Sequence, residues 1–518
     1  MKKFIQSKKF YLSAFTLVIV VVIIVVSCNK LDLQPLDRVT TDTYYKTSED
    51  FDGAVFAAYS SIQDFWGTST ETLGELGEFW KLSLVITDDV AADPLRAWDG
   101  VTLDVDRLLI RASDIPYAAM YTQVYEGILR ANLVIENAAA ENELTEEQKT
   151  QFTAEAKFLR AFFHFLALQL WGTPPLVTEV KKDLNNLASP NATKEELYAA
   201  ILSDLQDAYS GLPDSWDDAN LGRATKWTAR AFEGKVNVWK EDWDASITAF
   251  EDVIQNGPYQ LMPNYEDAFD FQKENNVESI FEVQYGGPFS DDNIWVFDDT
   301  HSEAFKASQG TSRVWYWDPS DPAPGGHLGW FVPTQNLVDE FEPGDPRLSS
   351  SVYKEGDTFY TIDGTAIAVL PYDSAWSSTH YSIKKYGGER NAKPADYSPN
   401  GQAQFNNERW YRYAEMLLLY AEALIRKGRS SDALAIINGQ IRARVGLGPT
   451  PIADPMKALQ HEKRVEMAFE PHRWFDIVRW GLGPEIFGSK WNDKFVVFPF
   501  PQSEIDRSAG LLQQNPGY

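Results

Sequence analysis

Tryptophans with polar neighbours recur in parts of the sequence that lack a helical pattern. A sugar ring has axial C–H groups on one face and hydroxyl groups at its rim, so an aromatic ring can stack on the face while Asp, Asn, Gln or Arg binds the rim. Three segments supply both kinds of group: Trp98-Asp99, Asp291–Trp295 and Arg313–Asp318. These residue types favour sugar binding. The alternative is that the rings only bury this part of the chain against the rest of the protein.

Residues suited to catalysis are few. None of the six His lies in an H-E-x-x-H motif, and the sequence has no G-x-x-x-x-G-K-[ST] loop and no G-x-S-x-G turn. The single cysteine, Cys28, follows the N-terminal apolar run, which excludes thiol catalysis and cysteine–zinc sites in the body of the protein. We therefore expect no enzyme activity, no catalytic residue and no cofactor.

Acidic residues leave two alternatives open. Asp88-Asp89 and Asp318–Asp321 could bind Ca²⁺ through oxygen ligands, but such runs are more often solvated turns, so we expect no metal site. A glycoside hydrolase needs only two carboxylates, which 75 acidic residues always allow. The sequence lacks the strand–helix alternation of a barrel, so a hydrolase is the less favoured alternative.

Composition sets broad limits. The chain has 518 residues, 47 basic and 75 acidic, for a formal net charge of −28. A charged share of 24 % and an apolar share of 44 % are ordinary for a globular protein. A nucleic-acid-binding protein needs a basic face, so the acidity argues against one. Aromatic residues make up 14 % of the chain, which is enough for some of them to face a ligand.

The N-terminus has the pattern of an export signal. Four lysines among the first nine residues precede an apolar run from Phe10 to Val26, and Ser27-Cys28 follows directly. A small residue before a cysteine at this place resembles a bacterial lipoprotein cleavage site. We expect a signal peptide over 1–27, lipidation of Cys28 and a tether over 28–37. An uncleaved membrane anchor is the alternative.

Helical periodicity dominates two parts of the chain. In Gln151–Leu170, apolar residues recur at steps of three and four and stop before Gly172. Thr193 and Glu196 have the spacing of a capping box. Two helix pairs have the spacing of tetratricopeptide-like repeats, although no strict 34-residue period runs through the chain. The predicted helices are Pro116–Ala140, Gln151–Leu170, Thr193–Leu212, the pair Thr225–Lys240 and Trp243–Asn256, and the pair Trp410–Lys427 and Ser431–Arg444.

The segment 262–408 differs from the rest. It is rich in Gly, Pro, Asp, Ser and aromatics, it lacks a sustained helical period, and it is too long for a simple loop. Strand-like runs occur at Ser279–Tyr285 and Phe359–Ile362. We expect a mainly α protein. Its N-terminal helical-repeat part spans 38–261, an irregular ligand-binding insertion spans 262–408, and a C-terminal helical part with an extended tail spans 409–518.

Most members of a set of charged residues lie within motif helices, among apolar neighbours. Isolated charges there would be costly, so we expect paired, hydrogen-bonded structural ions. The set is Arg160, Glu415, Glu422, Arg464, Glu466, Glu470, Arg473, Asp476 and Arg479.

Six stretches, in this order, resemble the SusD/RagB family of outer-membrane nutrient-binding lipoproteins of Bacteroidetes. They are Cys28 with its tether; Tyr125–Ile128 with Ala131-Asn132; Glu155–Ala161 and Trp171–Leu176; Tyr411–Ala423; His461–Glu466 with His472–Asp476 and Arg479–Gly481; and Gln514–Tyr518. Two positions depart from the family pattern: Pro471 replaces a usual glycine and Lys463 a common arginine. We expect Pro471 to end the helix that begins near Pro455.

The resemblance implies a tetratricopeptide-like scaffold, a non-catalytic role in capturing nutrients, usually glycans, at the outer-membrane surface, and a SusC-like TonB-dependent transporter as partner. It places the ligand where N-terminal loops meet the insertion. The predicted ligand-binding residues are Trp98, Asp99, Asn293, Trp295, Arg313, Trp315 and Trp317. Capture of a peptide or another nutrient, and a protein-interaction scaffold, are the alternatives.

Overall fold

The computed structural model describes residues 44–63, 65, 78–97, 100–183, 187–285, 316–319, 328–363, 366–386 and 406–518. The chain divides into two units, Met1–Lys46 and Thr47–Tyr518. The predicted signal peptide, Cys28 and the tether lie outside the described residues. Every element below belongs to the second unit. None of the helices within the described ranges is long and apolar enough to span a membrane.

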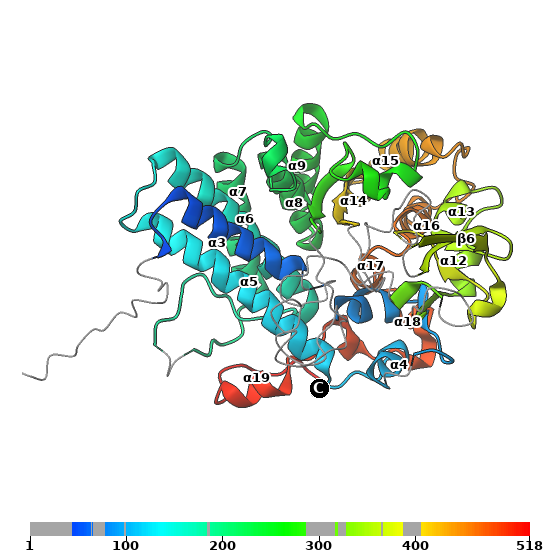
Figure 1. Ribbon diagram of the computed structural model, residues 1–518, viewed down its shortest axis with the longest axis horizontal. Helices are drawn as coiled ribbons and strands as arrows, with labels where there is room; N and C mark the ends of the chain where they lie inside the picture. Colours follow the sequence, from blue (N-terminus) through cyan, green and yellow to red (C-terminus); the bar gives the residue numbers. More distant parts are fainter. Residues whose placement is uncertain are drawn as a thin grey trace, which may run out of the picture. The chain divides into compact units, whose positions relative to one another are not determined.

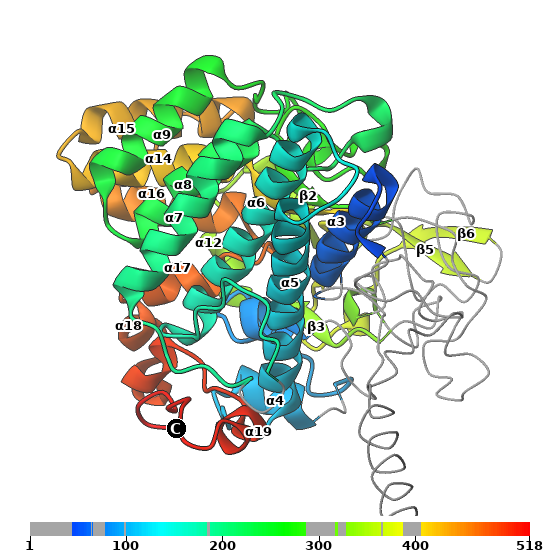
Figure 2. The ribbon, with the colours of Figure 1, turned by 90° about the vertical axis from the view of Figure 1, so that its left-hand side faces the viewer.

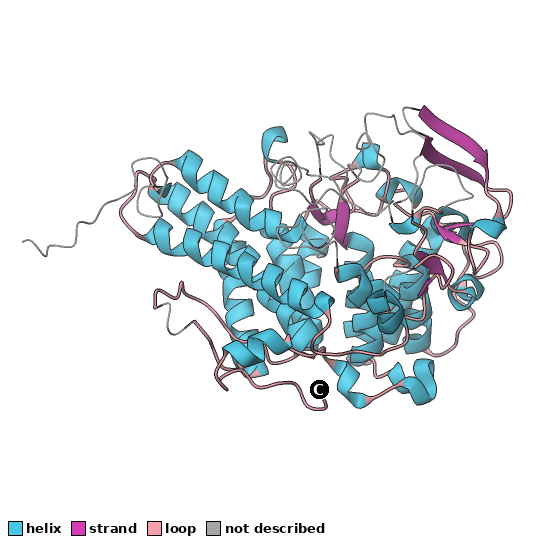
Figure 3. Ribbon diagram, turned by 60° about the horizontal axis from the view of Figure 1, so that its bottom comes forward, coloured by secondary structure: helices cyan, strands magenta, loops and turns pink. Residues whose placement is uncertain are grey.

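Helices packed side by side form most of this unit (Figures 1 and 3). Each packs on the next: α3 on α5, then α6, α7, α8, α9 and α14 in turn. This row of helices confirms the predicted mainly α, helical-repeat scaffold. Its members are α3 (Ser48–Gln63), α5 (Ile115–Ala139), α6 (Glu146–Trp171), α7 (Lys194–Gly211), α8 (Lys226–Trp239), α9 (Trp243–Asn256) and α14 (Tyr413–Arg426).

Local sequence signals set the ends of these helices. Thr145 caps α6 and Thr193 caps α7, each in a capping box with the residue three positions later, Gln148 or Glu196. The α6 helix ends at Gly172, whose φ of 72° suits a residue without a side chain. The predicted bounds of these helices are therefore confirmed to within a few residues, except that α6 begins at Glu146.

The predicted helix from Trp410 is wrong in its first turn. Glu408–Arg412 form strand β8, which pairs antiparallel with β2 (Ser279–Val283), and α14 begins only at Tyr413. The ribbon inserts rings into the helix row, since Phe281 lies 5.3 Å from Phe158 and Trp410 lies 5.0 Å from Phe162, measured between ring centroids. Burying these rings outweighs the local helical pattern.

Shorter helices follow α14. The predicted helix Ser431–Arg444 is α15 (Ser430–Ile436) continued by a π-helical segment, Ile437–Arg442. The next helix, α16 (Pro455–Glu466), ends before Pro471, and Phe469, with a φ of 63°, turns the chain between the helix end and this proline. The expectation that Pro471 ends this helix is therefore wrong. The other α-helices of the described residues are α4 (Gly100–Asp106), α12 (Gln335–Glu340), α13 (Pro346–Ser351), α17 (Arg473–Arg479), α18 (Gly483–Phe487) and α19 (Gln502–Arg507).

The described parts of 262–408 consist of short helices and two-stranded antiparallel ribbons. Strands β2 and β5 fall on the predicted runs Ser279–Tyr285 and Phe359–Ile362. The ribbons pair β1 (Val90–Ala92) with β3 (Phe331–Pro333), β4 (Val352–Tyr353) with β7 (Ser382–Ile383), and β5 (Thr358–Asp363) with β6 (Ala366–Pro371).

The charged residues predicted to pair do so. Arg160 binds Asp204 at 2.8 Å, and Arg479 binds Glu422 at 2.6 Å. The other members of the set also form ion pairs. Three members of the set also bind residues of the insertion: Arg464 pairs with Glu340, Glu466 with Arg347, and Glu470 with Lys385. The charges are therefore structural, as the sequence indicates.

The C-terminal tail closes one end of α6. The indole Nε1 of Trp171 donates to the carbonyl of Pro499 at 3.2 Å. In return, the side-chain amide of Asn515 donates to the carbonyls of Trp171 and Phe498 at 3.0 and 2.7 Å. These bonds satisfy a carbonyl at the helix end, which has no partner within the helix.

Candidate functional site

Six of the seven predicted ligand-binding residues lie outside the described residues: Trp98, Asp99, Asn293, Trp295, Arg313 and Trp315. The seventh, Trp317, is 2 % exposed, and its ring packs edge-on against Trp80 with centroids 4.7 Å apart. A ring in this position has no free face for stacking. The structure thus gives Trp317 a packing role, in line with the alternative interpretation of these tryptophans.

Two other tryptophans of the insertion, and the acidic pair considered for Ca²⁺, also contact the rest of the protein. Trp330 and Trp376 are buried, and Trp376 packs against Phe359. Asp88 and Asp89 bind the guanidinium groups of Arg473 and Arg464 rather than facing solvent. In the described part of the chain, no group of three or more His, Cys, Asp or Glu is arranged to hold a metal ion.

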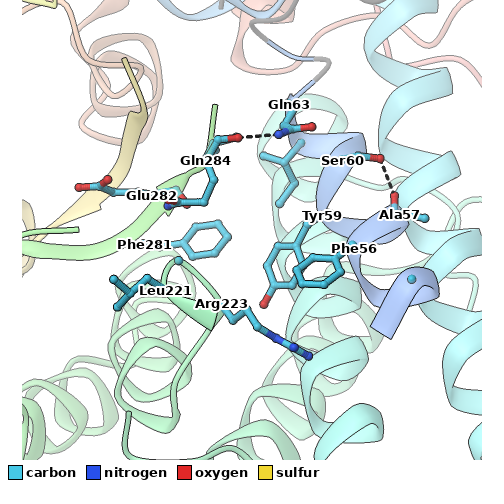
Figure 4. A pocket seen from close by; sticks show the side chains of 14 residues that line it. Phe56, Ala57, Tyr59, Ser60, Gln63, Leu221, Arg223, Phe281, Glu282 and Gln284 are labelled. Atoms are coloured by element: carbon cyan, nitrogen blue, oxygen red, sulfur yellow. Dashed lines mark hydrogen bonds between the residues drawn. The ribbon is translucent and has the colours of Figure 1, made fainter. Parts of the chain in front are cut away.

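Helix α3 lies beside β2 (Figure 2). A cavity of about 620 Å³ lies where these two elements meet the turn before α8 (Figure 4). Its size is within the range of small-molecule sites, roughly 300–1,000 Å³. The described residues that line it are Gly53, Phe56, Ala57, Tyr59, Ser60, Ile62, Gln63, Leu221, Gly222, Arg223, Phe281, Glu282, Val283 and Gln284. We call it the α3–β2 pocket.

Helix α3 supplies one wall. Phe56, Tyr59, Ser60 and Gln63 follow one another at steps of three, one and three, so they share one face of the helix. Phe56 remains 49 % exposed although it is a large apolar side chain. Such a residue beside a cavity is available to a ligand.

The turn Leu221–Arg223 supplies the opposite wall. Gly222 has a φ of 90°, and a Cβ atom there would come within 2.3 Å of the Gln284 side chain. Glycine therefore lets this turn approach the end of β2 closely. The turn leaves Leu221 53 % exposed across the pocket from α3.

Arg223 is the only cationic side chain among the described lining residues, and it is fully engaged. It binds both oxygens of Glu155 at 2.8 and 2.5 Å, and its Nη1 donates to Asp52 and Asn220 at 2.9 Å. Burial disfavours the charge, but the hydrogen bond and the charge of Glu155 outweigh it and raise the pKa of Arg223. Its planar group lies over the rings of Phe56 and Trp216, 5.2 and 4.3 Å from their centroids.

Tyr59 joins the same network. Its hydroxyl donates to Glu155 at 2.9 Å and accepts from the backbone N–H of Ala224 at 2.9 Å. Burial, followed by the charge of Glu155, raises the pKa of Tyr59 well above its usual value. The hydroxyl is therefore neutral and fixed. These groups position the Arg223 wall rather than activate a proton or a nucleophile.

The rim next to β2 holds two glutamines. The side-chain Nε2 of Gln63 donates to the carbonyl of Gln284 at 2.5 Å. The Gln284 side chain exchanges hydrogen bonds with Asn275 at 2.9 and 3.0 Å, so it is fixed from behind. Apolar walls with a few fixed polar groups are typical of a small-molecule binding pocket.

Sequence reasoning did not identify this pocket. Its residues come from three segments more than 50 residues apart, and each segment alone has the pattern of an ordinary helix, turn or strand. The sequence signal that could have indicated it is Gly222, between Leu221 and Arg223. A glycine in such a turn can mark a place where the backbone approaches another segment closely.

Comparisons with known proteins point to one family. Residues 277–495 match a family model described as SusD family, and residues 86–238 match one described as starch-binding, associating with the outer membrane. The SusD-like protein P2 of Formosa agariphila is 26 % identical, over 96 % of this chain and 98 % of that protein. A SusD-like protein from Bacteroides fragilis superimposes with a TM-score of 0.75 at 25 % identity, over 94 % of this chain and all of that one. A laminarin-binding SusD-like protein has a TM-score of 0.75 at 24 % identity, over 92 % and 100 % of the two chains.

Proposed function

Because this chain belongs to the SusD family, we propose that it is a non-catalytic glycan-binding protein of the bacterial outer-membrane surface. The α3–β2 pocket is the observation that carries the proposal, since its lining has exposed apolar groups and no free acid–base pair among the described residues. A relative with the same fold is described as laminarin-binding, which supports a glycan as the class of ligand.

The proposed ligand contacts extend beyond the pocket. Gln284 at its rim precedes the segment Asp291–Trp295 in the sequence. We keep Trp98, Asp99, Asn293, Trp295, Arg313 and Trp315 as proposed contacts on a longer glycan. Trp317 is left out because its ring is buried.

The proposal also covers the membrane anchor of the protein and its transport partner. Lipid chains on Cys28 would hold it on the membrane, since stable anchoring takes two or more acyl chains. A TonB-dependent transporter related to SusC is the proposed recipient of the bound glycan. The match to the outer-membrane family model supports this location.

Calorimetry on the full chain tests the function. The protein is purified in a sugar-free detergent and titrated with neutral α- and β-glucan oligosaccharides, and the sugars are then analysed by chromatography. We expect saturable binding and unchanged chain lengths. Shortened oligosaccharides would show a hydrolase, and lack of binding to every glycan tested would refute the proposal.

A further inference from the structure

We infer that the α3–β2 pocket is a subsite for an uncharged sugar residue, held between Phe56 and Leu221. This inference rests on the proposed function and adds both a place and a chemical class. It does not use the predicted tryptophans, because its contacts come from α3, the turn before α8 and β2.

Phe56 is a stacking surface fixed from behind. One side of its ring faces the guanidinium of Arg223, which in turn lies over Trp216. Glu155 holds that guanidinium with two hydrogen bonds, so the stack loses little entropy when a ligand arrives. The exposed surface of Phe56, a residue that is 49 % exposed, is then available to the C–H face of a sugar.

Leu221 forms the other side of this clamp. It is 53 % exposed, and it lines the same cavity from the opposite wall. A ligand that covers these two side chains removes apolar surface from water. Each Å² of apolar surface removed stabilises the complex by roughly 25 cal/mol. Sugars present such surface on their ring faces.

The rim offers a hydrogen-bond acceptor for a hydroxyl group. The side-chain Nε2–H of Gln63 donates to the backbone carbonyl of Gln284. This bond fixes the orientation of the Gln63 side chain. No described residue donates to the amide oxygen of Gln63, and Figure 4 shows it on the side away from Gln284. A sugar hydroxyl is a donor that matches this oxygen.

The charges of the lining are fully compensated. The carboxylate of Glu282 accepts from the side chain of Ser279, from the backbone N–H of Asn275 at 2.9 Å and from Asn407 at 3.1 Å, and it lies 3.3 Å from Arg409. The charge of Arg223 is paired with Glu155 and Asp52, and Asn220 accepts a further hydrogen bond from it. A uronate or sulfated sugar would find no free cation among the described lining residues. Its charge would lose hydration without gaining an ion pair, which costs free energy. The net charge of −28 opposes anionic chains as well.

The test compares matched variants of the full chain in a sugar-free detergent, titrated with neutral and uronic-acid oligosaccharides of equal length. Phe56→Ala and Leu221→Ala should each weaken binding of the neutral oligosaccharide by at least about fivefold, the low end for loss of an aromatic or apolar contact. Phe56→Trp should keep the affinity. Leu129→Ala is the control, because Leu129 is 45 % exposed on α5 and does not line the pocket.

Thermal melts confirm that each variant is folded, and Ala57→Trp, which fills the pocket from α3, gives a second route to the same loss. Uronic-acid oligosaccharides should bind more weakly than neutral ones by on the order of tenfold. If the wild type binds neutral glycans and none of the pocket variants changes the affinity, the subsite is wrong while the proposed function stands. Tighter binding of uronic-acid chains would overturn the assignment to uncharged sugars. If the wild type binds none of the oligosaccharides, both proposals fail.

Discussion

Glu466 is the most heavily paired carboxylate at the joint between α16 and the insertion. It is fully buried, 2.5 Å from Arg444 and 3.3 Å from both Arg412 and Arg347. Burial alone would raise the pKa of Glu466, but these three guanidinium groups outweigh it and lower the pKa to about 2. Losing this charge leaves buried cations under-compensated.

Glu466→Gln should therefore lower the free energy of unfolding by about 3–5 kcal/mol, the range for breaking a buried ion pair. Glu504→Gln is the matched control, because Glu504 pairs with Arg507 at the surface, where an ion pair contributes about 0–1 kcal/mol. Chemical denaturation measures both. Equal losses in the two variants would show that the buried network does not stabilise the fold.

His461 links stability to pH. Its Nδ1 lies 2.7 Å from Glu340 and its Nε2 lies 3.3 Å from Glu342. Both glutamates belong to the 262–408 insertion. Burial opposes protonation, but the hydrogen bond and charge of Glu340, with Glu462 and Glu342, raise the pKa of His461. The protonated ring therefore contributes stability that is fully present below the unfolded pKa of about 6.5 and is lost as pH rises through the folded pKa.

We expect the difference in unfolding free energy between wild type and His461→Gln to be largest at acidic pH and to shrink towards pH 8 and above. Denaturation curves over this range measure it. Glu340→Gln removes the main partner and should reduce the same pH dependence. A difference that grows with rising pH would contradict the assignment.

At the scale of elements, the helix row depends on close packing at a few glycines. On α5, a Cβ at Gly127 would lie 2.2 Å from the ring of Phe163 on α6. On α8, a Cβ at Gly234 would lie 2.3 Å from Phe250 on α9. These helices approach so closely that only glycine fits opposite the rings.

Gly127→Ala should destabilise the protein by about 1–3 kcal/mol through overpacking, despite the higher helix propensity of alanine. Gly439→Ala serves as the control, since nothing lies within 4 Å of its Cβ position. That control should be neutral or slightly stabilising. If thermal melts place Gly127→Ala at or above the wild type, the close packing of α5 on α6 does not constrain the fold.

Elements with local signals could be predicted from the sequence, and those defined by distant contacts could not. Thr193 and Glu196 define the start of α7 with their own side chains. Trp410, in contrast, follows the helical period of its neighbours but lies in a strand because it pairs with a segment about 130 residues earlier. No window of sequence around Trp410 contains that partner.

At the scale of the whole molecule, the family motifs lead to the scaffold rather than to the ligand. The stretches around Arg160 and Glu422 belong to the helix row and the stretch around Asp476 belongs to α17; all three are ion-paired, so they determine the fold. The pocket residues Phe56 and Leu221 carry no motif, because three segments meet only after folding. The predicted tryptophans were chosen by residue type alone, which cannot separate an open ring from a buried one such as Trp317.

Cys28→Ala should move the protein from the membrane fraction to the soluble fraction, because the proposed acyl chains are its only proposed anchor. Cell fractionation with immunoblotting measures the distribution, and metabolic labelling with a fatty acid detects the modification. Ser7→Ala, also in the N-terminal segment, is the control and should stay with the membrane. A Cys28→Ala protein retained in the membrane fraction would indicate an uncleaved anchor instead.

The bonds from Asn515 to the end of α6 have a consequence for biosynthesis. The two partners, Trp171 and Asn515, are 344 residues apart in the chain. A ribosome completes the first helices long before it reaches the residues that seal them, so this end of the helix row stays open throughout translation. Shortening the chain by its last four residues removes both Asn515 bonds and leaves only the earlier part of the tail, with Pro499, at this helix end, and an affinity tag attached there would sit against it.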